Sequence, residues 1–127
     1  MKVSTKIIFI IVLLVQMQIL KAESYTTSEY DSCINNARGS STFRECMSEE
    51  LRQQDAILNK NYKMTMKSIQ DFRRNKLRET QRAWIKYINL KCSSYYHKQS
   101  GSGGLEDDLQ CRIEETVRRA GELKNFY

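Results

Sequence analysis

The residues best suited to chemistry are four cysteines, and their spacing favours disulfides over metal binding or catalysis. They are Cys33, Cys46, Cys92 and Cys111. No Cys-x-x-Cys pair occurs and the chain has one histidine, so a zinc site is a poor fit. An even number of cysteines is typical of disulfides in a chain that enters an oxidising compartment. The sequence therefore predicts two disulfides and no metal.

The single histidine, His97, has no evident catalytic partners. Catalysis would need a nucleophile or an acid at a fixed distance from it, and no such set stands out. The acidic residues lie at expected helix starts or opposite Lys and Arg, which is typical of solvated faces. The Gly-Ser stretch at 101–104 lacks the Gly-x-x-x-x-Gly-Lys-Ser/Thr pattern of a phosphate loop. We expect a protein that is not an enzyme and uses no cofactor.

Residues 1–22 have the features of a secretory signal peptide. Lys2 and Lys6 precede an unbroken apolar run over residues 7–15, and Ala22 suits the position before a cleavage site. The run is shorter than the ~20 residues of a transmembrane helix, although an uncleaved membrane anchor is the alternative. We expect a mature domain of residues 23–127 that is periplasmic or secreted.

Cleavage after residue 22 would change the charge balance. The whole chain has 21 Lys and Arg and 15 Asp and Glu, a net charge of +6. Loss of Lys2, Lys6 and Lys21 leaves 18 basic and 15 acidic residues, a net charge of +3. Nucleic-acid binding depends on clustered positive charge that neutralises phosphates, so no nucleic-acid partner is expected.

Apolar periodicity predicts two long helices. Residues 43–99 contain neither Gly nor Pro, and apolar residues recur within them at helical spacing. The first stripe is Met47, Leu51, Leu58, Tyr62, Ile69 and Phe72; the second, out of phase, is Leu77, Gln81, Trp84, Ile88, Cys92 and Tyr95. One helix of this length would approach ~85 Å, too long for a small domain. We expect a turn near residues 73–76, with Asn75 in the left-handed conformation.

The remaining signals complete an all-α prediction. Residues 28–37 favour a short helix closed by Gly39. Thr42 and Glu45 have the spacing of a capping box, which predicts the start of the first long helix. A Gly-Ser loop over residues 97–104 precedes a third helix from Leu105 to Ala120. The expected fold is a small helical bundle: a long antiparallel helical hairpin, a third helix and a short N-terminal helix.

Helix geometry favours the pairing of Cys33 with Cys46 and of Cys92 with Cys111. A loop centred near residue 101 places the second pair at matched distances along antiparallel helices. A short connector joins the first pair. Pairing Cys46 with Cys92 would have to bridge an axial offset of ~15 Å.

An ordered set of positions resembles one protein family. The set is Thr42, Glu45, Cys46, Asp55, Leu58, Asn59, Tyr62, Leu77, Gln81, Arg82, Ala83, Trp84, Ile85, Tyr87, Cys92, Gly103, Gly104, Cys111, Thr116, Arg119 and Leu123. It resembles the LprI-like lysozyme-inhibitor domain of secreted bacterial proteins, over roughly residues 33–123. The resemblance implies a helical extracytoplasmic domain and, for the family's named member, inhibition of lysozyme.

The chain departs from the family pattern after Tyr87. Ile88 and Asn89 stand where the family usually has an arginine and then an acid. If that arginine pairs with the family's Asp-x-x-Leu-Asn acid, Asp55 needs another partner here, and Arg82 and Arg112 are the candidates.

Two pairs of motif residues have a structural and a functional interpretation. Asp55 and Asn59 are four apart, so they share a helix face. They could form a recognition pair or a polar network that fixes how helices dock. Gln81 and Trp84 could likewise contribute to recognition, but Trp84 is best explained as a core anchor.

The candidate partner contacts lie around the second loop. They are Tyr95, Tyr96, His97, Gly103 and Gly104. The loop is either a mobile connector or a protruding tip that enters a partner's cleft. Common animal lysozymes are strongly basic, so an acidic patch would favour binding; the clusters Glu45, Glu49, Glu50 and Glu106, Asp107, Asp108 could provide it.

These observations give two functional hypotheses. The leading one is an exported binding protein that blocks the cleft of a lysozyme-like cell-wall hydrolase, as a host-lysozyme inhibitor or an immunity protein. The alternative is an envelope-associated factor that binds anionic cell wall or membrane surface. Its basic helix face would be Arg74, Arg78, Arg82 and Lys86, which is otherwise a solvated face.

Overall fold

The structure, a computed structural model, describes residues 25–96 and 101–126. Helices α2 (Ser28–Asn36), α3 (Ser40–Ser68), α4 (Asp71–Ser93) and α5 (Gly101–Lys124) account for most of them, and this part of the chain contains no strand. The all-α expectation is confirmed. The expected signal peptide and His97 lie outside the described residues.

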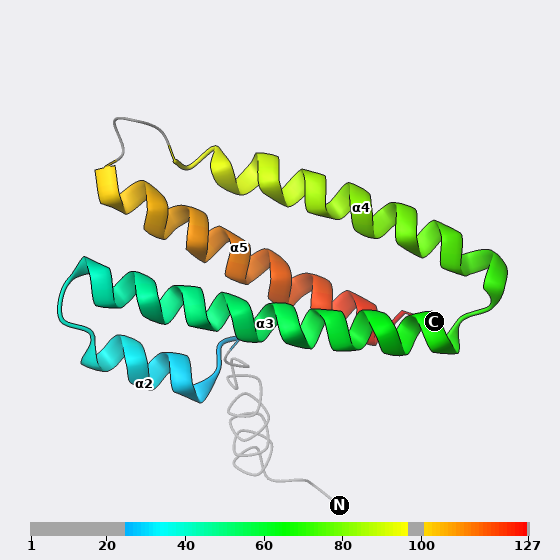
Figure 1. The fold of residues 1–127 in the computed structure, drawn as a ribbon, viewed down its shortest axis with the longest axis horizontal. Coiled ribbons are helices and arrows are strands. Elements are labelled where there is room, and N and C mark those ends of the chain that lie inside the picture. Colours follow the sequence, from blue (N-terminus) through cyan, green and yellow to red (C-terminus); the bar gives the residue numbers. More distant parts are fainter. Residues whose placement is uncertain (1–24, 97–100, 127) are drawn as a thin grey trace, which may run out of the picture.

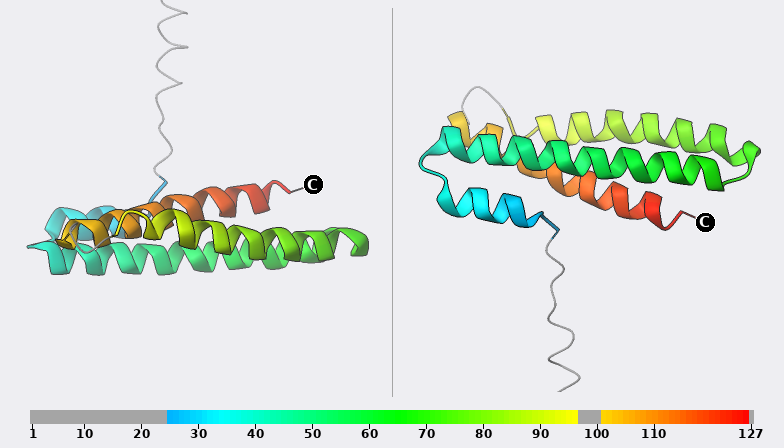
Figure 2. Two further views of the ribbon diagram at one scale, coloured as in Figure 1. Left: turned by 90° about the horizontal axis from the view of Figure 1, so that it is seen from above. Right: turned by 60° about the horizontal axis from the view of Figure 1, so that its bottom comes forward.

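The three long helices form the body of the domain. α3 and α4 are consecutive and antiparallel, and α5 runs back alongside both (Figure 1). α5 makes its most extensive contact with α3 and a smaller one with α4. α2 folds back along the first half of α3 (Figure 2). α5 is thus the element on which both helices of the hairpin, α3 and α4, pack.

The main core lies where α3, the start of α4 and the end of α5 meet. Its buried residues are Leu58, Ile69, Leu77, Ala120 and Leu123. The partly buried residues Tyr62, Met66, Trp84 and Phe126 pack against them. Thr65 Oγ1 donates to the carbonyl of Leu123 at 2.7 Å, so this buried hydroxyl is paired.

A buried carboxylate attaches the N-terminal segment to α3. Glu50 is 1% exposed and accepts hydrogen bonds from the Thr27 backbone N–H at 3.1 Å and the Thr27 hydroxyl at 2.5 Å. Gln54 Nε2 donates to the same carboxylate at 2.8 Å. Thr27 Oγ1 also accepts from the backbone N–H of Tyr30 and so caps α2. The expected short helix is present and ends at Asn36.

The start of α3 differs from the capping-box prediction. The helix begins at Ser40, preceded by Gly39 at φ 92°, and no side chain caps it. Thr42 lies inside the first turn, where its hydroxyl donates to the carbonyl of Arg38 at 3.4 Å. Gly39 makes the earlier start possible, because its positive φ is strained for a residue with a side chain. Thr42 and Glu45 therefore do not form the predicted cap.

The turn between α3 and α4 was predicted too late in the chain. Ile69 (φ −84°, ψ 155°) and Gln70 (φ −66°, ψ 151°) are extended, and Asn75 lies inside α4. The turn needs no left-handed residue, so it carries no Gly or Asn signal. Phe72, predicted on a buried stripe, is 74% exposed because α3 has already ended.

Both predicted disulfides are present. Cys33 pairs with Cys46 at a Cα–Cα distance of 5.7 Å, and Cys92 pairs with Cys111 at 5.5 Å. Each bridge joins helices that are consecutive in the chain.

The loop prediction between α4 and α5 needs two corrections. α5 begins at Gly101, so Gly103 and Gly104 belong to its first turn and are not loop residues. Tyr95, the last residue of the second predicted stripe, is 49% exposed because it lies beyond the end of α4 at Ser93.

Across the described residues, we find no helix whose length and apolarity would suit it to span a membrane.

Candidate functional site

Eight residues of the family set line one groove between α3 and α4. Its lining residues are Asp55, Leu58, Asn59, Tyr62, Arg78, Gln81, Arg82, Trp84 and Ile85, and its volume is about 260 Å³. We call it the α3–α4 groove. It opens because these two helices pack mainly on α5 and little on each other. The other positions of the family set, Thr42, Glu45 and Tyr87 among them, lie outside this lining.

The α3 side of the groove presents an acid and an amide. Asn59 Nδ2 donates to Asp55 Oδ2 at 3.0 Å, and both side chains are exposed. This bond lies within one helix, so it does not tie α3 to a neighbour. Of the expected partners of Asp55, Arg82 lines the same groove, whereas Arg112 bonds instead to Asn89 at 2.9 Å and to Asp108 at 2.9 Å.

The α4 side is held by α5. Arg119 Nε donates to Gln81 Oε1 at 2.9 Å, and Arg119 Nη1 donates to Glu122 Oε2 at 2.8 Å. Nη2 of the same guanidinium is buried and finds no hydrogen-bond acceptor among the described residues. Trp84 is half-buried and packs against the main core, as expected of a core anchor. The Gln81 side chain is therefore held by Arg119, and the Trp84 side chain is held by the main core.

A second, more open hollow continues from the groove toward the α3–α4 turn. It is lined by Tyr62, Lys63, Met66, Lys67, Arg74 and Arg78, with a volume of about 640 Å³. We call it the basic hollow. The guanidinium of Arg74 already has two partners there: it pairs with Asp71 at 2.5 Å and donates to the carbonyl of Met66 at 2.7 Å. Among the described residues Lys63, Lys67 and Arg82 make no ion pair.

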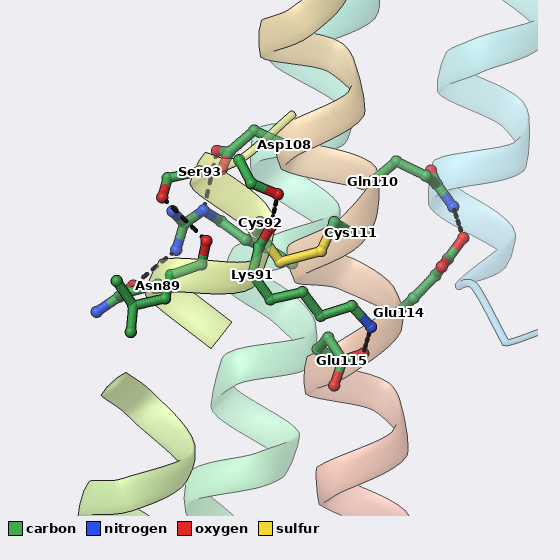
Figure 3. Close-up of a disulfide and its surroundings, with 12 residues drawn as sticks. Asn89, Lys91, Cys92, Ser93, Asp108, Gln110, Cys111, Glu114 and Glu115 are labelled. Carbon is green, nitrogen blue, oxygen red and sulfur yellow. Dashed lines mark hydrogen bonds and ion pairs between the residues drawn. A yellow bond between two sulfur atoms is a disulfide. The ribbon is translucent and has the colours of Figure 1, made fainter. Parts of the chain in front are cut away.

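The other end of the bundle is braced by the Cys92–Cys111 disulfide (Figure 3). Beside it, Lys91 Nζ lies 2.6 Å from Glu115 Oε1, and Arg118 bonds to the other oxygen of the same carboxylate. Arg112 of α5 reaches Asn89 of α4. One disulfide and two polar links thus fix α4 against α5 here; we call this region the braced end.

The Glu115 carboxylate is buried, and two effects on its pKa oppose each other. Burial alone would raise the pKa of Glu115, because it disfavours the charged form. Hydrogen bonds from Lys91 and Arg118 lower it by more, so the pKa lies below its usual value. The hydrogen bond that Lys91 donates to this carboxylate raises the pKa of Lys91.

Two candidate contact residues are exposed at the braced end. Tyr95 and Tyr96 are 49% and 50% exposed. Their backbone N–H groups donate to the carbonyls of Cys92 and Ser93, at 3.1 and 3.2 Å. The two tyrosines therefore belong to a hydrogen-bonded turn next to the disulfide.

Acidic side chains lie at the same end, although fewer than expected. Arg44 pairs with Glu106 at 3.3 Å, which brings the start of α5 to α3. Glu45 and Asp107 are exposed. Glu49 is exposed too, and hydrogen bonds from Arg52 and Gln53 lower its pKa to about 2. Glu50, predicted as part of this acidic patch, is instead buried against Thr27.

No group of three or more His, Cys, Asp or Glu side chains comes close enough to hold a metal ion within the part of the chain that the structure describes.

Fold and surface together define a small all-α domain, braced by two disulfides, that presents a groove and an exposed aromatic end. A family model described as lysozyme inhibitor LprI matches residues 33–123. The chain belongs to the LprI lysozyme-inhibitor family. No curated protein and no solved structure gives a significant match.

The role of some site residues could not be predicted from the sequence. Arg78 was expected only on a basic helix face and Ile85 only as part of the family set, and the bond between Gln81 and Arg119 was not predicted. The signal for that bond was the presence of both residues in the family set; their contact depends on the rotation of α4 about its axis, which periodicity leaves open.

Proposed function

We propose that this protein is an exported inhibitor of a lysozyme-like cell-wall hydrolase, and that it blocks the substrate cleft of that enzyme with its braced end. Inhibition of this kind requires no bond-making chemistry. It requires a surface that keeps its shape while it displaces the glycan substrate.

The observation that carries the proposal is the family match over residues 33–123, which spans almost all of the described chain. The two disulfides agree with it, because disulfides persist in oxidising compartments outside the cytoplasm. The signal-like features of residues 1–22 fit the same location.

The braced end suits such a contact for three reasons. Tyr95 and Tyr96 expose aromatic area of the kind that dominates binding hot spots. The disulfide and the Lys91–Glu115 pair limit the ordering cost on binding. Exposed Glu45 and Asp107, which make no ion pair among the described residues, give this end negative charge that complements a basic hydrolase.

A muramidase turnover assay tests the proposal. Oxidised protein spanning residues 23–127 should slow hydrolysis of cell-wall substrate at micromolar concentration, by competition with substrate. The assay compares host-type and bacterial lysozymes. Inhibition of a host-type enzyme would indicate a host-lysozyme inhibitor, and inhibition of a bacterial enzyme would indicate an immunity protein. No slowing with any of them would contradict the proposal.

Binding to an anionic envelope surface is the second candidate function. It is favoured by the cations Lys63, Lys67 and Arg82, which make no ion pair within the described chain. Binding to cell wall or anionic vesicles through such charges should weaken steeply with salt. Salt-insensitive binding would contradict this second function.

A further inference from the structure

We propose that the α3–α4 groove is a saccharide site that binds a carboxylate-bearing N-acetylated sugar of the bacterial wall glycan. This site lies away from the braced end and does not depend on hydrolase inhibition. From the second candidate function it takes only the anionic wall as the source of the ligand.

The shape of the groove fits a small ligand. Its volume of about 260 Å³ is just below the roughly 300–1,000 Å³ that is typical of small-molecule sites. The basic hollow shares Tyr62 and Arg78 with it, so a longer glycan could extend from one into the other. A lipid surface would instead need a convex or flat apolar face that can enter the headgroup layer.

Two aromatic side chains provide surfaces for a sugar ring. Trp84 of α4 and Tyr62 of α3 both line the groove. Each is half-buried and packs against the main core, so its ring is held in place before a ligand arrives. An aromatic ring offers an apolar face to the C–H groups of a pyranose, while its polar atom can still meet water or a hydroxyl.

Polar side chains of the kind that bind hydroxyl and acetamido groups lie beside these rings. Asn59 and Gln81 each carry a donor and an acceptor on one amide, and Asp55 accepts only. Asn59 is bonded to Asp55, and Gln81 is bonded to Arg119 from α5. Because these contacts restrict the side chains in advance, less conformational entropy is lost on binding.

The charge of the groove selects an acidic sugar over a neutral one. Arg78 and Arg82 line it against the single acid Asp55. Arg82 makes no ion pair in the described structure, and Arg78 bonds only to the neutral amide of Asn75. Guanidinium groups bind carboxylates in a bidentate, charge-assisted way. Lys63 and Lys67 extend the positive charge into the basic hollow.

Trp84 makes the test direct, because it is the only tryptophan of the chain and it lines the groove. The oxidised protein is titrated with the peptide-free wall disaccharide N-acetylglucosaminyl-N-acetylmuramic acid, whose lactyl carboxylate is free, and Trp84 fluorescence is followed. We expect a saturable change. Chitotetraose, which has N-acetyl groups and no carboxylate, should bind more weakly by about tenfold or more, since a charge-assisted hydrogen bond contributes about 1.5–3 kcal/mol.

Variants locate the binding. Arg82→Gln should weaken binding of the carboxylate-bearing disaccharide about tenfold and leave chitotetraose binding nearly unchanged. Lys60→Gln, which removes an exposed charge of α3 outside the groove lining, should bind like the wild type. Calorimetry repeats each titration without relying on fluorescence.

Three results would overturn the proposal. The first is no fluorescence change and no heat with the carboxylate-bearing disaccharide at millimolar concentration. The second is equal weakening by Arg82→Gln and Lys60→Gln. The third is a glutamate-containing peptide of the same charge that binds as tightly as this disaccharide, which would identify the groove as a site for an acidic protein. Hydrolase inhibition is measured separately, so either proposal can fail alone.

Discussion

Arg119 Nε of α5 donates a hydrogen bond to Gln81 Oε1 of α4 at 2.9 Å, at the edge of the α3–α4 groove. Since α3 also packs along α5, this helix helps to set the distance between the two groove walls. Arg119 therefore supports the groove without lining it.

A double-mutant cycle tests this support. Gln81→Ala and Arg119→Ala should each destabilise the protein, because each leaves a partly buried polar group without its partner. The double variant should lose less than the sum, with a coupling energy of about 1 kcal/mol. Urea unfolding measures all four proteins. Simple additivity would mean that the bond contributes nothing to the fold.

The exposed tyrosines at the braced end should carry inhibition. Tyr95→Ala with Tyr96→Ala should raise the inhibition constant by at least about thirtyfold, since hot-spot aromatics contribute about 2 kcal/mol or more. Phe72→Ala is the matched control, because Phe72 is also an exposed aromatic but lies at the opposite end of α4. Equal loss in both proteins would place the contact elsewhere.

The two disulfides should differ in what they support. Replacing either pair by Ala should lower the free energy of unfolding by about 2–4 kcal/mol. Loss of Cys92–Cys111 should also weaken inhibition, since that bridge holds the braced end. Loss of Cys33–Cys46 should leave inhibition by the remaining folded protein unchanged, because this bridge attaches α2. Unfolding curves and turnover assays on the same samples separate the two effects.

Acid should remove the contribution of Glu115. Its pKa is lowered in the folded state, so it stabilises the fold above its usual value of 4.5, and this stabilisation is lost as the pH falls through the lower folded-state pKa. Glu115→Gln should melt below the wild type at pH 7, and the gap should narrow below pH 4.5. Melting curves at several pH values measure this gap. A gap that stays constant down to pH 2.5 would rule out this linkage.

Truncation of a buried apolar residue of α4 should lower the free energy of unfolding far more than truncation of an exposed one. Leu77 is 1% exposed within the main core, so Leu77→Ala should cost about 2–5 kcal/mol. Phe72→Ala should change stability by less than about 0.5 kcal/mol, as at most exposed sites. Calorimetric melting distinguishes them. A large loss at Phe72 would favour the turn position expected from sequence.

The helices and disulfides could be predicted from the sequence because their signals are local. Apolar spacing follows from 3.6 residues per turn, and the pairing of Cys92 with Cys111 follows once a loop is placed near Gly101. The turn could not be placed correctly, because Ile69 and Gln70 adopt ordinary extended conformations that any residue accepts. The cap at Thr42 failed because Gly39 permits an earlier start.

The groove is a tertiary feature and was only partly predictable. The family set named Asn59, Gln81 and Trp84, but their convergence depends on how α3 and α4 rotate against α5. The burial of Glu50 could not be predicted either, because its partner Thr27 is distant in sequence and the neighbouring acidic residues suggested an exposed patch.

Each bridge unites a cysteine with the very next cysteine of the chain. For a polypeptide threaded N-terminus first into an oxidising space, an enzyme that oxidises thiols in their order of emergence would produce the native connectivity directly. Maturation would then need an oxidant and no isomerase, so the slow reshuffling that delays many secreted proteins by minutes to hours is avoided.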